Sequence, residues 1–528
     1  MVEHLRFTAR GEKPLLQIIH NDLLDELEDG VTDRESLRLI QVDDLHESLN
    51  HTITSLGSLT LYRSLTHPPQ DINVVQAKQE AVAELRNNDR IRKPIIDYLE
   101  NFKALEDSFL KFINDDLDTM FPYKDFKLAT KAASDLKEIS RVIPKPESAY
   151  LKNLADVIKS YEKSSVYQLM RGPIYKTRQG LKSKEEVRFW TLKRRFWPTS
   201  FGPSTIIPMI PFGFFAISAF TGFKQKEVLS IFDDKMDLYL IINLYLPMFG
   251  MMANRVKPTI DLRTFIQPLN ELAQKNQIFL QAVDVVGKVD ELNSFLEFSK
   301  TAASSTVTPK ITDNNSHSFK AEDLRNPVLG KEDENFVPNA VDLRGLIFVT
   351  GPNSGGKTTI CKTVVQSQLM AQIGCDILAK NAVINVATKI AYQAPKFDAL
   401  EDSEGRFGTE LSRTRDIFFS IGSKSLVVLD ELAEGTTREE KMQVSQAVLN
   451  GFEKKGGTTV LVTHNHELVY DFKEEEKGQF LQVEFDGDHP TFKLVPGIST
   501  SSHADKIAQK IGFSEKDIET HLRDGGYL

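Results

Sequence analysis

The stretch that decides the fold of this chain is GPNSGGKT at residues 351–358. It follows the apolar run LIFVT at residues 346–350 and opens the helix-like run TTICKTVVQSQL at residues 358–369. Glycines at this spacing let backbone N–H groups turn inward around phosphates at the start of a helix. A glycine loop between a strand and a helix is the context that a P-loop needs, so the stretch predicts an α/β domain that binds ATP.

Two side chains of this loop are predicted to carry its chemistry. Lys357 can reach the β- and γ-phosphates, and the Thr358 hydroxyl is placed to ligate Mg²⁺. The alternative is an ordinary Gly-rich turn. The predicted cofactor-binding residues of the loop and the following helical turn are Ser354, Gly355, Gly356, Lys357, Thr358 and Thr359.

Two further apolar runs end in polar side chains that suit the same site. SLVVLDE, at residues 425–431, ends in Asp430, which can hold Mg²⁺ through water, and in Glu431, which can orient and polarise the attacking water. TTVLVT, at residues 458–463, ends before His464, which can sense the γ-phosphate or hold the water. A solvated acidic loop and an ordinary loop histidine are the alternatives. We expect the catalytic residues to be Lys357, Glu431 and His464, and the metal ligands to be Thr358 and Asp430.

The composition describes a folded protein of several domains. The chain has 528 residues, which is too many for one core, and 41% of them are apolar. Its net charge of -9 argues against a surface that attracts nucleic acid everywhere, although local basic stretches can still do so. The two cysteines, Cys361 and Cys375, have no metal-ligand spacing, and the N-terminus lacks the apolar run of a secretory signal. We therefore expect a cytoplasmic protein.

The spacing of apolar residues divides the chain into three expected domains. Three- and four-residue spacing in the first half, as at Val75, Val82 and Leu85, predicts helices. Beyond the Ser-, Thr- and Asn-rich stretch 301–318, short β-branched runs alternate with helical stretches, which predicts a mainly parallel sheet. We expect an N-terminal segment at 1–45, an all-α core and lever domain at 46–300, and an α/β P-loop ATPase domain with short C-terminal helices at 301–528.

The middle of the chain combines a basic stretch with two charge-free segments. Residues 171–195 hold nine basic residues and two acidic ones, and residues 196–223 and 238–254 carry no charge. The basic stretch suits contact with DNA phosphates, and a solvated helix face is the alternative. The charge-free segments suit either a membrane hairpin with basic flanks or buried helices. Prolines in the first segment and the modest length of the second count against the hairpin.

Three motifs taken together resemble one family. GPNSGGKTT, LDELAEGTT and VTHNHEL resemble, in order and spacing, the three ATPase signatures of the MutS family of DNA mismatch repair ATPases. Supporting similarity comes from LRNPVL at 324–329, FVPN at 336–339, LMAQIGC at 369–375 and the C-terminal FKLVPGISTSSHADKIAQKIGF. The resemblance is strong over 306–520, and it is fair over 50–100.

The resemblance implies further site residues. Phe336 would stack on adenine, Asn353 would meet the γ-phosphate side, and the segment around Glu410 would be offered to the nucleotide of a partner subunit. Where the family usually shows Ser-Thr before a Phe, this chain has Gly405 and Arg406. We hypothesise that Arg406 acts in trans as a cation beside the phosphates, and a plain surface arginine is the alternative.

The resemblance also implies a function with two versions. The first is a homodimeric ATPase that hydrolyses ATP to switch a clamp on double-stranded or branched DNA, in mismatch repair or recombination. About 45 residues precede the helical core, whereas a mismatch-reading domain needs roughly 100, so we expect recognition of DNA structure instead of mismatches. The alternative is a membrane-associated ATPase switch that inserts a two-segment hairpin and has no direct DNA role.

Overall fold

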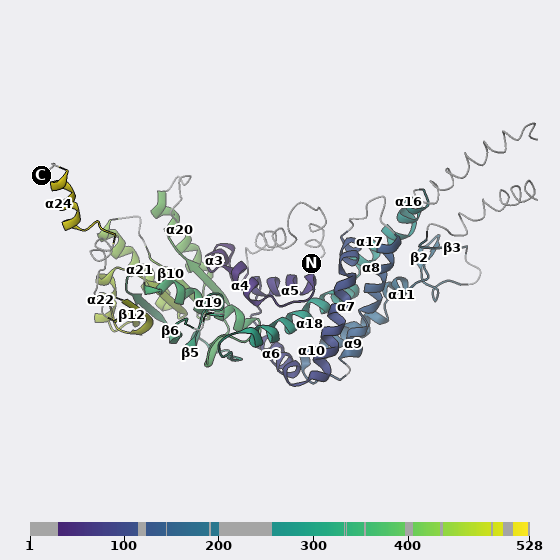
Figure 1. The fold of residues 1–528 in the computed structure, drawn as a ribbon, viewed down its shortest axis with the longest axis horizontal. Coiled ribbons are helices and arrows are strands. Elements are labelled where there is room, and N and C mark those ends of the chain that lie inside the picture. Colours follow the sequence, from purple (N-terminus) through teal and green to yellow (C-terminus); the bar gives the residue numbers. More distant parts are fainter. Residues whose placement is uncertain are drawn as a thin grey trace, which may run out of the picture. The chain divides into compact units, whose positions relative to one another are not determined.

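The computed structural model in Figure 1 describes residues 30–114, 123–143, 145–188, 192–199, 256–331, 333, 335–352, 355–395, 405–432, 437–486, 489–499 and 511–525. The chain forms two compact units, each assembled from separate stretches of sequence. Unit 1 comprises Met1–Asp22, Thr52–Thr60 and Asn87–Glu291, and unit 2 comprises Leu23–His51, Leu61–Arg86 and Leu292–Leu528. The contiguous domains 1–45, 46–300 and 301–528 therefore stay a prediction.

Unit 1 is built mainly from helices packed around aromatic side chains. The helices are α7 (Asp89–Ile113), α8 (Tyr123–Asp135), α9 (Glu138–Val142), α10 (Ala149–Glu162), α11 (Ser165–Arg171), α16 (Lys257–Asp261), the π-helical turn η3 (Leu262–Ile266), α17 (Gln267–Lys275) and most of α18 (Gln277–Thr301). The Asn88 side chain accepts a hydrogen bond from the Arg90 N–H and starts α7. Phe109 of α7 and Tyr161 of α10 both contact Phe279 of α18, so three helices share one core.

Unit 1 also contains a small sheet where an all-α domain was expected, so that expectation is wrong in this respect. β1 (Tyr175–Thr177) lies between β2 (Gly180–Lys182) and β3 (Arg194–Arg195), and both pairings are antiparallel. The solvated helix face proposed for 171–195 is wrong for the described residues after Arg171, which is the last residue of α11. Strands of two and three residues are too short to show an alternating pattern, which explains why the sequence did not reveal them.

Unit 2 contains a six-stranded sheet whose central strands are fully buried. The strand order is β13 (His489–Pro496), β12 (Gln479–Asp486), β7 (Leu346–Thr350), β11 (Thr458–Val462), β10 (Ser425–Asp430) and β9 (Lys389–Gln393). All pairings are parallel except that between β12 and β13. Every residue of β7 and β11 is buried, as expected for strands covered on both faces.

A second sheet and several helices complete unit 2. The four strands are mixed in direction, in the order β4 (Lys310–Thr312), β8 (Asn381–Asn385), β5 (Ser318–Leu324) and β6 (Asn339–Arg344). The helices are α3 (Arg34–Leu39), α4 (Val42–Leu49), α6 (Ile72–Asn87), α19 (Lys357–Gln372), α20 (Gly405–Ser420), α21 (Arg438–Lys455), α22 (His466–Glu474) and α24 (Glu515–Asp524), while α5 (Ser55–Thr66) and α18 contribute residues to both units. The expected multidomain chain with helical and α/β parts is thus confirmed, with mixed sheets.

The charge-free segments 196–223 and 238–254 lie outside the described residues, apart from positions 196–199. Within the part of the chain that the structure describes, no helix combines the length and the apolar character needed to cross a bilayer.

Candidate nucleotide-binding site

The predicted site residues follow three neighbouring strands of the six-stranded sheet. β11 pairs in parallel with β7 on one side and with β10 on the other. The carboxyl ends of these strands therefore meet at one edge of the sheet, which is where ligands bind in open α/β sheets. The glycine loop follows β7, Asp430 is the last residue of β10, and His464 comes shortly after β11.

The backbone of the glycine loop requires glycine at defined positions. Gly351 has a φ of 137° and Gly356 a φ of 81°, and both values belong to conformations that L side chains rarely adopt. A Cβ atom on Gly355 would lie 3.0 Å from the Val483 side chain. Gly356 precedes α19, which begins at Lys357. Asn353 and Ser354 lie outside the described residues, and the Thr359 carbonyl, in the first turn of α19, accepts a hydrogen bond from Thr363.

Lys357 points back into the glycine loop. Its ammonium group donates to the carbonyl oxygens of Gly351 at 2.6 Å and Pro352 at 2.8 Å, and it lies 3.4 Å from Nε2 of His464. The residue is 3% exposed, and this burial lowers the pKa of the ammonium group, whereas the nearby Asp430 opposes the change. A buried cation at the start of a helix suits the binding of phosphates.

Asp430 and Thr358 form the candidate metal-binding pair. The Thr358 hydroxyl donates to Oδ2 of Asp430 at 2.9 Å, and the Tyr392 hydroxyl donates to the same oxygen at 3.4 Å. Burial raises the pKa of Asp430, and these two hydrogen bonds partly offset that effect. A carboxylate and a hydroxyl side by side are oxygen ligands of the kind that Mg²⁺ prefers. The sequence did not reveal Tyr392, whose only signal was a polar side chain near the end of a buried strand.

Glu431 and His464 face each other beside this pair. Glu431 has a φ of 67°, which is unusual for a side chain larger than glycine, and its N–H donates to the Val462 carbonyl at 2.8 Å. Its Oε1 lies 3.7 Å from Nε2 of His464. The structure therefore brings His464 near both Glu431 and Lys357, whereas the competing His466 is the first residue of α22.

Two aromatic side chains, Phe336 and Phe492, lie on segments that a hydrogen bond from Asn339 connects. Phe336 packs against Gly330, where an added Cβ would lie 3.0 Å from the ring. Phe492, on β13, is 48% exposed, and its ring lies 3.4 Å from the Cβ position of Gly356. The Asn339 amide donates to the Phe492 carbonyl at 3.0 Å. The family resemblance implied Phe336, whereas no sequence pattern pointed to Phe492, because only the sheet order brings β13 to the glycine loop.

The segment expected to act in trans opens helix α20. The backbone of Arg406 belongs to α20, but its side chain lies outside the described residues. Phe407 packs against the core of the six-stranded sheet, and the Glu410 carbonyl accepts a hydrogen bond from Gln393 at 3.4 Å. The trans role of Arg406 stays a prediction.

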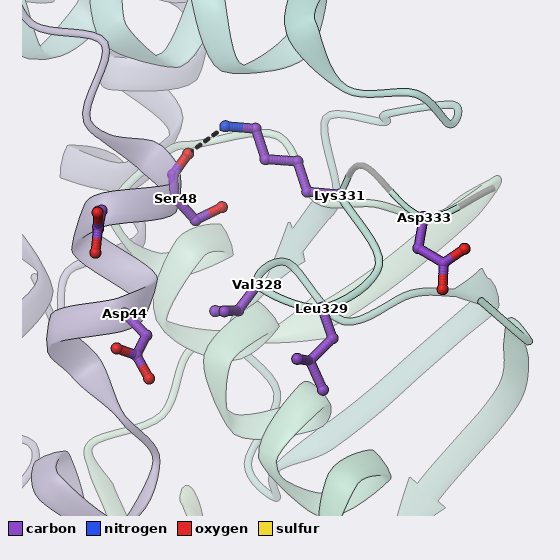
Figure 2. A pocket seen from close by; sticks show the side chains of 7 residues that line it. Asp44, Ser48, Val328, Leu329, Lys331 and Asp333 are labelled. Atoms are coloured by element: carbon purple, nitrogen blue, oxygen red, sulfur yellow. Dashed lines mark hydrogen bonds between the residues drawn. The ribbon is translucent and has the colours of Figure 1, made fainter. Parts of the chain in front are cut away.

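A separate pocket of about 640 Å³ lies in unit 2 between α4 and the loop that follows β5 (Figure 2). Its lining includes three carboxylates, from Asp44, Glu47 and Asp333, and the ammonium group of Lys331 donates to the Ser48 carbonyl at 2.6 Å. None of the residues predicted for the nucleotide site lines this pocket. It is therefore distinct from the candidate site.

Comparison with known proteins defines the class. Residues 347–521, which include the glycine loop, Asp430, Glu431 and His464, match the family model of MutS domain V. Residues 16–296 match the family model of MutS domain III, and this match alone covers more than half of the chain. The chain therefore belongs to the MutS family.

Curated relatives carry two kinds of name. The DNA mismatch repair protein MutS of Caldanaerobacter subterraneus subsp. tengcongensis is 26% identical over 507 residues, which cover 89% of this chain and 57% of that protein. The corresponding protein of Methanosarcina barkeri is 22% identical over 90% of this chain and 57% of its own length. Endonuclease MutS2 of Streptococcus sanguinis is 27% identical over 50% of this chain and 34% of that protein. The chain thus spans little more than half the length of the two MutS proteins and about a third of the MutS2 protein.

Proposed function

We propose that this member of the MutS family is an ATPase that converts ATP and water into ADP and phosphate. The observation that carries the proposal is the meeting of an ammonium, a hydroxyl, two carboxylates and an imidazole at one edge of the six-stranded sheet. These groups come from Lys357, Thr358, Asp430, Glu431 and His464. Membership of the MutS family supports the same reading.

The nucleotide would lie across the glycine loop and the start of α19. Backbone N–H groups at a helix start attract phosphate oxygens, and Lys357 adds a positive charge within the loop. Phe336 would stack on the adenine, and the exposed ring of Phe492 offers a second aromatic surface beside Gly356. The other proposed phosphate-binding residues are Asn353, Ser354, Gly355, Gly356 and Thr359.

Thr358 and Asp430 would hold Mg²⁺, and the adjacent carboxylate of Glu431 would serve the chemistry. Mg²⁺, when bound, neutralises charge on the phosphate oxygens. Glu431 orients a water molecule and accepts its proton as the water oxygen bonds to the γ-phosphorus. The bond from that phosphorus to the bridging oxygen breaks, and ADP keeps the oxygen. His464, 3.7 Å from Glu431 and 3.4 Å from Lys357, would report the state of the γ-phosphate to both.

Substitution of Glu431 tests this assignment. Glu431→Gln keeps the size of the side chain but removes the base, so ATP should still bind while turnover falls by about 10² to 10⁴. Equilibrium binding of ATP and single-turnover hydrolysis measure the two effects separately. Glu467→Gln is the matched control, because Glu467 is an exposed carboxylate that pairs with Arg438. Unchanged hydrolysis in Glu431→Gln would refute the proposed role.

The names of the relatives support a DNA partner, and we propose that a homodimer of this chain acts on double-stranded or branched DNA in repair or recombination. The start of α20, with Arg406, would reach the nucleotide of the partner subunit. Branched or duplex DNA should then raise the ATPase rate. A rate that no DNA structure changes would overturn this part of the proposal and leave the ATPase itself standing.

A further inference from the structure

The small sheet of unit 1 carries basic and aromatic side chains on a single face. Tyr175 on the central strand pairs with Lys182 of β2 and with Arg195 of β3. Paired residues of antiparallel strands point to the same side of a sheet, so these three side chains form a row across it. Lys193 and Trp197 alternate with Arg195 along the chain and extend the row. We call Lys182, Tyr175, Lys193, Arg195 and Trp197 the basic aromatic face.

Two of the three cations of this face, Lys193 and Arg195, lie over its rings. The ammonium group of Lys193 lies 5.3 Å from the centre of the Tyr175 ring, and the guanidinium group of Arg195 lies 4.2 Å from the Trp197 ring. In the described part of the chain, these two cations contact rings, and no carboxylate pairs with either of them. Arg194 differs, because it reaches Asp261 at 3.5 Å. The basic aromatic face therefore presents positive charge that the described residues around it do not neutralise.

Residues 197–199 and Lys257, which lie on either side of the undescribed stretch 200–255, contact each other beside this face. The ammonium group of Lys257 donates to the carbonyl oxygens of Trp197 at 2.9 Å and Thr199 at 2.8 Å. It also pairs with Asp261 at 2.6 Å, and Lys257 is only 6% exposed. This buried cation fixes the two ends of the intervening segment to each other.

Aliphatic side chains are exposed around these two ends. Leu192, just before β3, is 80% exposed, while Val256 and Ile260, at the return of the chain, are 44% and 43% exposed. Trp197 itself is 40% exposed. These exposed side chains flank the two chain ends that Lys257 joins, where the charge-free sequence 196–223 begins and shortly after 238–254 ends.

We propose that the basic aromatic face docks on a lipid bilayer that contains anionic headgroups. Tryptophan and tyrosine rings favour the boundary between headgroups and acyl chains, and lysine and arginine beside them attract anionic lipids. A DNA backbone would match the cations, but it offers no apolar partner for Trp197, which is 40% exposed on the same face. The exposed indole of the face therefore favours lipid over DNA. The proposal concerns a surface of unit 1 and does not depend on the proposed ATPase.

Trp197 provides a direct test, because the chain has two tryptophans and Trp190→Phe leaves Trp197 as the only one. The full chain with this change is mixed, without nucleotide, with vesicles of equal parts phosphatidylcholine and phosphatidylglycerol that contain brominated acyl chains. We expect the emission of Trp197 to shift to the blue and to be quenched. With phosphatidylcholine alone, or at high salt, the quenching should be several times weaker, because attraction to anionic lipid is lost or screened.

Charge reversal on the face gives the second arm of the test. Lys193→Glu with Arg195→Glu, in the Trp190→Phe background, should reduce the quenching by mixed vesicles to the level of neutral vesicles. The control is Lys127→Glu with Lys131→Glu on α8, which changes the net charge equally at two other exposed positions. Equal quenching by both lipids and in both double variants would overturn the proposal. It would also fail if duplex DNA, and not vesicles, altered the emission of Trp197.

Discussion

The carboxyl edge of the six-stranded sheet and the start of α5 each hold a carboxylate, which is partly buried at the sheet edge and fully buried beside α5. Burial raises the pKa of Asp430 at the sheet edge, and it raises the pKa of Asp290 beside α5 to about 6. Asp430 accepts from the hydroxyl groups of Thr358 and Tyr392, and Thr358 is exposed. Asp290 accepts from the Thr54 hydroxyl and from two backbone N–H groups, and it is fully buried.

A second carboxylate, that of Glu106, binds the start of α5 in unit 1. Glu106 of α7 accepts from the backbone N–H groups of Ser55 and Leu56 at 3.0 and 2.9 Å, so two acids hold the first turn of α5. A Cβ on Gly57 would lie 2.2 Å from Oδ2 of Asp290, which leaves no room for a ligand. A raised pKa therefore does not identify a catalytic group by itself. A cation alone does not separate the two sites, because Lys103 pairs with Glu106 at 2.9 Å. Access from solvent and a cation buried within a glycine loop, Lys357, distinguish the edge of the sheet.

Removal of the Lys357 ammonium group should have the largest effect on the sheet-edge site. Lys357→Ala deletes the ammonium group that the loop carbonyls hold, so we expect ATP affinity and hydrolysis to fall by about 10³-fold. Titration with a fluorescent ATP analogue and measurement of phosphate release would record both losses.

Lys362→Ala provides the control for this variant. Lys362 lies further along α19, and its ammonium group donates to the Gln41 side chain at 2.9 Å. Its loss should leave ATP affinity within about twofold, since that contact lies outside the glycine loop. If both variants bound ATP equally well, the sheet edge would be no more than another structural cluster of charges.

The pH dependence of stability tests the role of Asp290 at the start of α5. The folded pKa of Asp290, about 6, lies above its ordinary value of 3.8, so the folded protein binds this proton more tightly than the unfolded chain does. The resulting stability is fully present below the ordinary pKa and is lost as the pH rises through about 6, with an upper limit of about 3 kcal/mol. Asp290→Asn should remove this decline, and urea unfolding on both sides of that interval would show it.

Asp284→Asn on the same helix is the comparison for Asp290→Asn. Asp284 pairs with Lys288 at 2.7 Å near the surface, so its loss should leave the decline of stability with pH in place. A wild-type protein whose free energy of unfolding rises across the interval, with no such rise in Asp290→Asn, would show that hydrogen bonds outweigh burial at this carboxylate.

The sequence revealed one of these regions and not the other because of how far apart the partners lie. A strand, a glycine loop and a helix are consecutive, and the acidic pair directly ends a strand, so local patterns were enough to propose Lys357 and Asp430. Asp290, Glu106 and the start of α5 come from three distant stretches with no motif of their own. Tyr392 and Phe492 were missed for a related reason, because the order of the strands alone brings β9 and β13 to the site.

The smallest expected effect concerns the ring beside the glycine loop. Phe492→Ala removes one aromatic surface, so ATP should bind about fivefold more weakly, which corresponds to about 1 kcal/mol. Inorganic tripolyphosphate, which has no base, should bind as before, and Phe419→Ala is the control because that ring is 72% exposed on α20. Equal weakening of ATP and tripolyphosphate would show that the Phe492 ring, 3.4 Å from the Cβ position of Gly356, supports the glycine loop and does not contact the base.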